Sequence, residues 1–122
     1  MQQQAQMPVS GHSMVSSSEV NGTNVFSTAG DLLGHIDHLM IDKASGQISC
    51  AVMRFGGFFG LGAGQHPIPW KKLHYDVARG GYVTDLTAAQ VASAPARPED
   101  WQANRDFLRR SYDYYGVPPF WL

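Results

Sequence analysis

Residues 34–70 read GHIDHLMIDKASGQISCAVMRFGGFFGLGAGQHPIPW, and this stretch decides the fold. Two apolar runs, Ile36–Ile41 and Ile48–Phe55, flank a polar turn that contains Ser45-Gly46. The second run is apolar at odd and even positions alike, which predicts a central strand buried on both faces. The first run breaks strict alternation, which predicts either a β-bulge near Asp37-His38 or a strand end that is buried on both sides. The stretch therefore predicts a hairpin at the centre of a β-sheet.

The glycine-dense segment that follows, residues 56–64, is similar in composition to a nucleotide-binding loop. Its sequence context does not support nucleotide binding. It lacks the Gly-Lys-Ser/Thr of a phosphate loop, and a proline-rich strand follows it where a phosphate cradle needs a helix. We interpret it as a turn. Phe58 and Phe59 either expose apolar area at its tip, as a contact surface, or fold back onto the sheet. Pro67 and Pro69 lack N–H groups and predict an edge strand.

The flanking sequence supplies more short strands and two helices. Residues 19–28 predict one strand or a strand pair, and residues 73–77 and 81–86 predict two more. Thr87 and Gln90 have the spacing of a capping box, which predicts a short helix. About six short strands at close spacing indicate a small antiparallel barrel or sandwich.

The C-terminal region, residues 95–122, predicts a second helix and an extended tail, Val117–Leu122, in which paired prolines forbid helix. One face of that helix carries a largely aromatic stripe of Trp101, Arg105, Leu108, Tyr112 and Tyr115. We expect this stripe to pack on a barrel. An RNA-stacking surface is the alternative, but four arginines and four acids leave the region without an electrostatic drive toward RNA.

Length and charge limit the classes of protein to consider. The chain has 122 residues and a net charge of -1, which suits one domain and gives no basic excess for nucleic acid. Its single cysteine, Cys50, excludes a disulfide within the chain and a thiolate cluster. No apolar run approaches the ~20 residues of a membrane span, and no secretory signal is evident, so we expect a cytoplasmic protein.

Candidate catalytic and metal-binding residues do not form a recognisable set. In a regular strand His35 and Asp37 share a face while His38 lies opposite, so the three do not converge on a metal. The sequence has no Gly-x-Ser-x-Gly elbow, and Cys50 lies in an apolar run, so a nucleophile is missing. We therefore expect no enzyme activity, cofactor or physiological metal site.

Several segments, taken in order, resemble the PRC-barrel domain family. They are Asp31–Ile36, Ile41-Asp42, Ser45–Ile48, Phe55–Gly62 and Ile68–Trp70. The C-terminal Tyr115–Trp121 is similar to the Tyr-Gly-x-Pro-Pro-Tyr/Phe-Trp ending of free-standing bacterial members. The family includes the barrel domains of the photosynthetic reaction centre H subunit and of the ribosome maturation factor. The resemblance implies a six-stranded barrel that acts as a binding or assembly module, with no common catalytic residues.

Together these observations predict a mainly β protein. We expect a disordered tail over residues 1–18, a six-stranded antiparallel PRC-type barrel over 19–94, and a helix with a Pro-Pro-Phe-Trp tail over 95–122. The expected function is a non-enzymatic protein-interaction module with a protein partner, including self-association as a homodimer. The expected interaction surface comprises Phe58, Phe59, Trp101, Leu108, Tyr112, Tyr115, Phe120 and Trp121.

Four alternatives to this expectation stay open. By resemblance, the module could serve photosynthetic or electron-transfer complexes, with peripheral contact to a membrane complex. An RNA- or ribosome-associated factor is the second alternative, although the charge gives it no support. A small-ligand binder and a metal binder that uses the histidines are the others.

Overall fold

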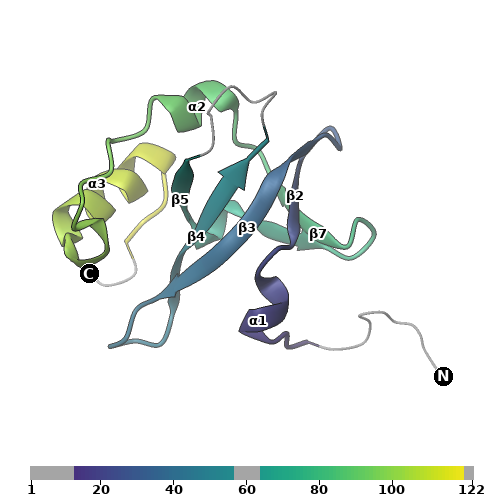
Figure 1. Cartoon of the computed structure of the whole chain (residues 1–122), viewed down its shortest axis with the longest axis horizontal. Coiled ribbons are helices and arrows are strands. Elements are labelled where there is room, and N and C mark those ends of the chain that lie inside the picture. The colour runs from purple at the N-terminus through teal and green to yellow at the C-terminus, as the bar shows by residue number, and fades with distance from the viewer. Residues whose placement is uncertain (1–12, 57–63, 120–122) are drawn as a thin grey trace.

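The computed structural model describes residues 13–56 and 64–119, which form a curled six-stranded sheet with short helices around it (Figure 1). The strands follow one another across the sheet in the order β5-β4-β3-β2-β7-β6. The strands are β2 (Asn24–Ser27), β3 (Leu32–Ile41), β4 (Ile48–Phe55), β5 (Gln65–Pro69), β6 (His74–Asp76) and β7 (Gly81–Thr84). The helices are α1 (Ser17–Val20), α2 (Ala88–Ala92) and α3 (Arg105–Tyr115), with 3₁₀ turns η2 (Trp70–Lys72) and η3 (Trp101–Ala103).

The expectation of a closed, wholly antiparallel barrel is wrong in two respects. The sheet is open, with β5 and β6 at its two edges, and β2 pairs with β7 in parallel. The parallel pair follows from the connection through η2, across which β5 and β6 keep the same chain direction. The β6–β7 hairpin then reverses the chain, so β7 lies beside β2 and runs in the same direction as β2. The expectation of six strands is confirmed.

The central β3–β4 hairpin forms as the sequence predicts. The pairing register shifts between Ile36 and His38, which confirms the β-bulge. At the turn, the Asp42 carboxylate accepts hydrogen bonds from the backbone N–H and the hydroxyl of Ser45, at 2.9 and 2.8 Å. Gly46 adopts a φ of 77°, a left-handed conformation that glycine takes at little cost. The hairpin is thus specified by local residues.

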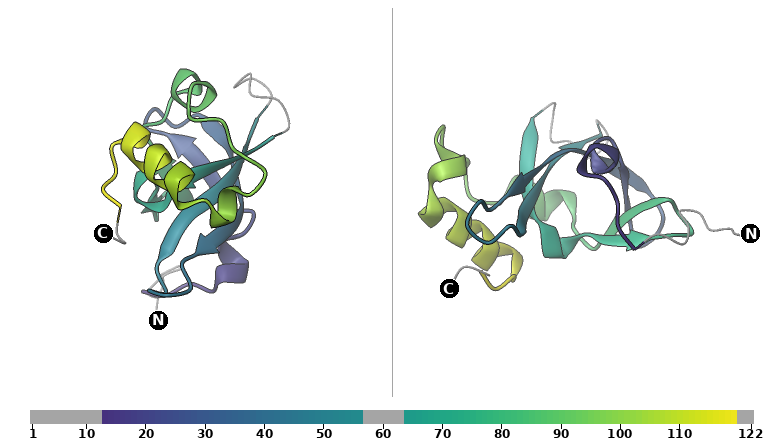
Figure 2. Two further views of the ribbon diagram at one scale, coloured as in Figure 1. Left: turned by 90° about the vertical axis from the view of Figure 1, so that its left-hand side faces the viewer. Right: turned by 90° about the horizontal axis from the view of Figure 1, so that it is seen from below.

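Strand β4 divides the apolar interior into two clusters, as its double-sided apolar pattern predicts. Ala51, Met53 and Phe55 face the larger cluster inside the curl of the sheet. The other face of the strand contributes to a smaller cluster formed by Cys50, Val52, Trp101 and Phe107. The C-terminal segment therefore covers the outer face of β4, and Figure 2 shows α3 lying along this side of the sheet, away from α1.

In the N-terminal region the single-strand alternative is confirmed and the strand pair is not. Ser16 and Glu19 form a capping box, so residues 17–20 begin the described fold as α1 and only β2 is a strand. Val20 lies buried in the larger cluster. A helix therefore spans the boundary at residue 18 that separates the expected tail from the expected barrel.

The C-terminal helix begins later than expected. The Asn104 side chain caps it by accepting a hydrogen bond from the Phe107 N–H at 3.0 Å, so Trp101 lies in η3 and not on the helix. Because of this shift, Arg105 is exposed and Phe107 becomes the most deeply buried residue of α3. Gly116 ends the helix in a left-handed conformation, as the sequence predicts.

Candidate functional site

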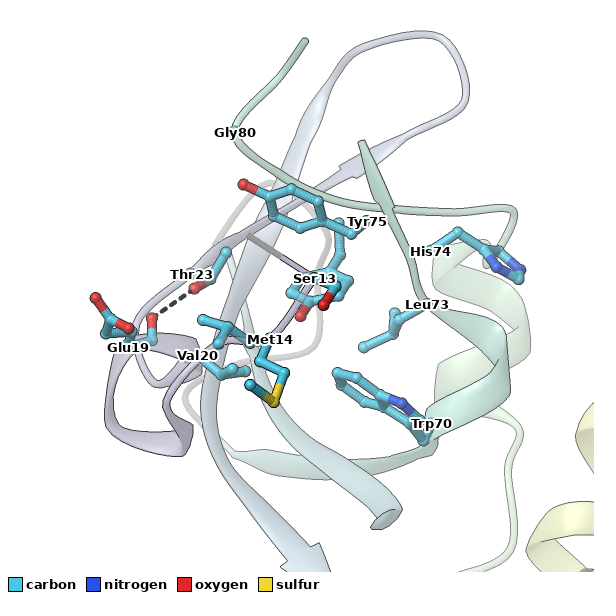
Figure 3. A pocket seen from close by; sticks show the side chains of 12 residues that line it. Ser13, Met14, Glu19, Val20, Thr23, Trp70, Leu73, His74, Tyr75 and Gly80 are labelled. Atoms are coloured by element: carbon cyan, nitrogen blue, oxygen red, sulfur yellow. Dashed lines mark hydrogen bonds between the residues drawn. The ribbon is translucent and has the colours of Figure 1, made fainter. Parts of the chain in front are cut away.

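A cavity of about 780 Å³ lies on the open side of the curled sheet, between the N-terminal segment, η2 and the β6–β7 hairpin. Trp70 and Leu73 point into it, whereas the ring of His74 is directed away (Figure 3). Met14, which precedes α1, lies at the mouth with 86% of its surface exposed. The lining combines apolar and aromatic side chains with the polar side chains of Ser13, Glu19, Thr23 and His74.

Three aromatic rings form a row along the wall of this cavity. Tyr82 packs edge-on against Trp70 and against Tyr75, with ring centroids 5.3 and 5.2 Å apart. Burial, and secondly the neighbouring Tyr75, raises the pKa of the Tyr82 phenol, so this phenol is uncharged at neutral pH. Tyr75 ends the row at the edge of the sheet and remains 46% exposed. The row thus presents an aromatic ring to solvent beside the outermost strand.

A polar network lies on the outer face of the sheet at the β-bulge. Asp37 accepts hydrogen bonds from Arg54 Nε at 3.1 Å and Gln65 Nε2 at 3.2 Å, and its Oδ2 lies 2.6 Å from His38 Nδ1. The contacts with His38 and Arg54 lower the pKa of the Asp37 carboxyl. The regular-strand argument that separated Asp37 from His38 is wrong, because the bulge brings the two side chains together. The mutual pairing of these groups indicates a structural role.

His66, on β5, is the described histidine whose ionisation the fold opposes most clearly. Its Nε2 is buried without a hydrogen-bond partner among residues 13–56 and 64–119, and its ring packs on Phe55 with centroids 5.6 Å apart. Burial, and secondly the positive charge of Arg97, lowers the pKa of His66 below its ordinary value of 6.5. The folded protein therefore holds this imidazole neutral.

This environment predicts that the protein loses stability in mild acid. Between the lowered pKa of folded His66 and the value near 6.5 of the unfolded chain, the unfolded state binds more protons, so the free energy of unfolding falls as pH drops through this interval. Urea unfolding from pH 7.5 downward is expected to show this decrease, and His66→Gln is expected to reduce the slope. The exposed His35→Gln serves as control, and an equal reduction in both variants would contradict the assignment.

Cys50 is not available as a nucleophile. It lies buried in the smaller cluster, and burial raises the pKa of its thiol to about 12. At neutral pH it is therefore a neutral thiol that packs as a small apolar side chain.

The predicted interaction residues fall into two groups. Trp101, Tyr112 and Tyr115 are buried within the chain itself, and Leu108 packs against the smaller cluster. The Tyr112 hydroxyl also donates a hydrogen bond to the Ser49 carbonyl, which ties α3 to β4. In the described chain these four residues thus join α3 and η3 to the sheet. Phe58, Phe59, Phe120 and Trp121 lie outside the described residues.

Sequence reasoning missed the residues that form the aromatic row. Tyr75 and Tyr82 belong to strands that the sequence predicts, but nothing in their spacing indicates that they stack with Trp70. The only local signal is a tyrosine on each strand of the β6–β7 hairpin, which could have suggested a cross-strand aromatic pair. Phe107 was likewise missed, because the helix was expected to begin earlier.

The described chain has neither a metal-binding cluster nor a membrane-spanning helix. Across residues 13–56 and 64–119, no three His, Cys, Asp or Glu side chains are grouped so that they could hold a metal ion. Within the same residues, the helices are too short or too polar to cross a membrane.

Comparison with known proteins identifies the family. The profile of the PRC-barrel domain matches residues 12–91, which is well over half of the 122 residues. No curated protein shows significant similarity to the chain. The matched range contains all six strands together with the cavity and its aromatic row. The chain therefore belongs to the PRC-barrel domain family.

Proposed function

We propose that this protein is a non-enzymatic protein-interaction module whose contact surface is the aromatic edge around β6. The observation that carries the proposal is the set of exposed apolar side chains at this edge, namely Met14, Val15, Tyr75 and Val77. Grouped apolar side chains of this kind on a protein surface mark contact sites more often than isolated ones do. The PRC-barrel family suggests an interaction or assembly role in general terms, and the exposed apolar side chains support the β6 edge as the proposed contact surface.

The chemistry of the remaining groups also supports a binding role over catalysis. The thiol of Cys50 is buried and neutral, and the Asp37 carboxylate is engaged by three side chains. The net charge of -1 supports a protein partner over RNA. The cytoplasmic location and a link to photosynthetic or electron-transfer complexes remain predictions.

Photo-crosslinking in cells tests this proposal. A photoreactive phenylalanine analogue at Tyr75 of the full chain is expected to give discrete adducts that protease removes and nuclease does not. The same analogue at Tyr114, an exposed tyrosine on α3, is the matched control and is expected to give few adducts. Nuclease-sensitive adducts, or equal crosslinking at the two positions, would argue against the proposal.

A further inference from the structure

The two edges of the open sheet differ in their capacity to accept another strand. Pro67 and Pro69 lie two residues apart on β5 and have no N–H group. The two missing donors therefore fall on one side of that strand. Helix α3 also packs beside β5. Strand β6 contains no proline, and no described strand lies beyond it. An exposed edge presents unpaired N–H and C=O groups to another strand, and among the two edges only β6, which is three residues long, offers them without prolines.

The sequence of β6 is complementary to itself. In an antiparallel pair of two β6 strands centred on Tyr75, His74 of each copy lies opposite Asp76 of the other. An imidazole and a carboxylate in directly opposed positions form a favourable cross-strand pair, and the two-fold axis produces this pair twice. We infer that two copies of this chain associate through β6, which joins their sheets into one continuous sheet.

The Asp76 carboxylate has room for such a contact. Its Oδ1 accepts the Ala78 N–H at 2.9 Å, and its Oδ2 lies 3.4 Å from Arg79 Nε. A carboxylate offers about four acceptor positions, so an imidazole N–H from the second copy finds a free one. His74 is exposed and directed away from the cavity (Figure 3), which leaves its ring accessible to the second copy.

The opposite face of β6 supplies the apolar part of the interface. Tyr75 of one copy faces Tyr75 of the other, so the row of Trp70, Tyr82 and Tyr75 continues into its symmetry mate. Met14, which lines the same cavity as the row, and Val77, which directly follows β6, are 86% and 64% exposed and lose solvent contact on association. Self-association thus removes the exposed end of the aromatic row from water.

A charge-exchange experiment on the full chain tests both the dimer and its register. The unmodified chain is expected to sediment as a dimer at high micromolar concentration. His74→Asp places two acids opposite each other, and Asp76→Lys places a lysine opposite His74. Each variant alone is expected to dimerise at least about tenfold more weakly, because each carries two unfavourable pairs. An equimolar mixture is expected to restore the dimer, because only the heterodimer opposes acid to base at both positions.

Controls separate loss of pairing from loss of folding. Circular dichroism checks that each variant is folded, and Asp113→Lys on α3 is expected to leave the dimer unchanged. Asp76→Asn keeps an oxygen for the Ala78 N–H and is expected to weaken the dimer without disturbing the turn.

Three results would overturn the inference. These are a monomeric full chain, a mixture that fails to restore the dimer, and a dimer that appears only after residues 1–12 are removed. The last result would mean that the chain's own N-terminal segment occupies the edge. The inference rests on the proposed function, but the two can fail separately. If Tyr75 crosslinks to a different protein while the chain stays monomeric, the interaction module stands and self-pairing does not.

Discussion

Replacing Gly34 with alanine is expected to lower the free energy of unfolding by about 3 kcal/mol or more. Gly34 lies in β3 opposite Phe55 of β4, and it also pairs with Val25 of β2. A Cβ at this position would lie 2.1 Å from the Arg54 carbonyl oxygen and 2.9 Å from the Phe55 Cα. Both are backbone atoms of the neighbouring strand, which cannot rotate away as a side chain could. The central pair of strands must therefore separate or lose its register.

Urea unfolding followed by circular dichroism measures this loss, and a second glycine provides the matched control. At Gly64 the nearest atom to an added Cβ is His66 Nε2 at 3.8 Å, an ordinary contact. Gly64→Ala is thus expected to change stability by less than about 0.5 kcal/mol. A Gly34→Ala variant as stable as Gly64→Ala would show that β3 and β4 do not approach as closely as described.

Truncation of Phe107 to alanine is the second change with a large expected effect, about 3–5 kcal/mol of destabilisation. The ring is only 1% exposed and packs edge-on against Trp101, with centroids 6.4 Å apart. Together with Cys50 and Val52 it fills the space between α3 and the outer face of β4. Removal of the ring leaves a cavity in this small cluster and loosens the attachment of the C-terminal helix.

Chemical denaturation measures the loss for Phe107→Ala, and alkylation of Cys50 reports on the cluster directly. The native thiol is expected to resist alkylation, and in the variant it is expected to react faster, because the cover over it is weakened. The exposed Asp113→Ala on the same helix controls for effects of substitution in α3. If Phe107→Ala matched Asp113→Ala in both measurements, α3 would not be docked on β4 in solution.

Much of the β-sheet could be predicted because its signals are local. The bulge at Asp37 follows from a break in alternation within one strand, and the edge position of β5 follows from prolines that lack N–H groups. The short helix after β7 follows from the capping spacing of Thr87 and Gln90, whose two reciprocal hydrogen bonds are present at 3.1 and 3.0 Å. In each case the residues that carry the signal also form the structure.

The start of α3 shows where local signals compete. The pattern from Trp101 to Tyr115 has helical spacing, and acids after Pro98 favour a helix start there. Asn104 nevertheless caps the helix, and a 3₁₀ turn places Trp101 against β4. Packing of Trp101 in the smaller cluster therefore outweighed the periodicity, and that cluster depends on β4, which lies about fifty residues earlier in the chain.

By itself, the sequence determined the central hairpin, the proline edge, the capping of α2 and membership of the PRC-barrel family, and it limited the irregularity of β3 to a bulge or a buried strand end. Only the tertiary structure decided that β2 and β7 run parallel, that the sheet stays open, and that Tyr75 ends an aromatic row at an edge that remains free among the described residues. The reason is physical. Turns, caps and bulges depend on neighbours along the chain, whereas the order of strands and the exposure of an edge depend on which distant segments pack together. The proposed interaction surface belongs to the second kind, whereas four of the residues expected from the sequence, Trp101, Leu108, Tyr112 and Tyr115, pack within the described chain.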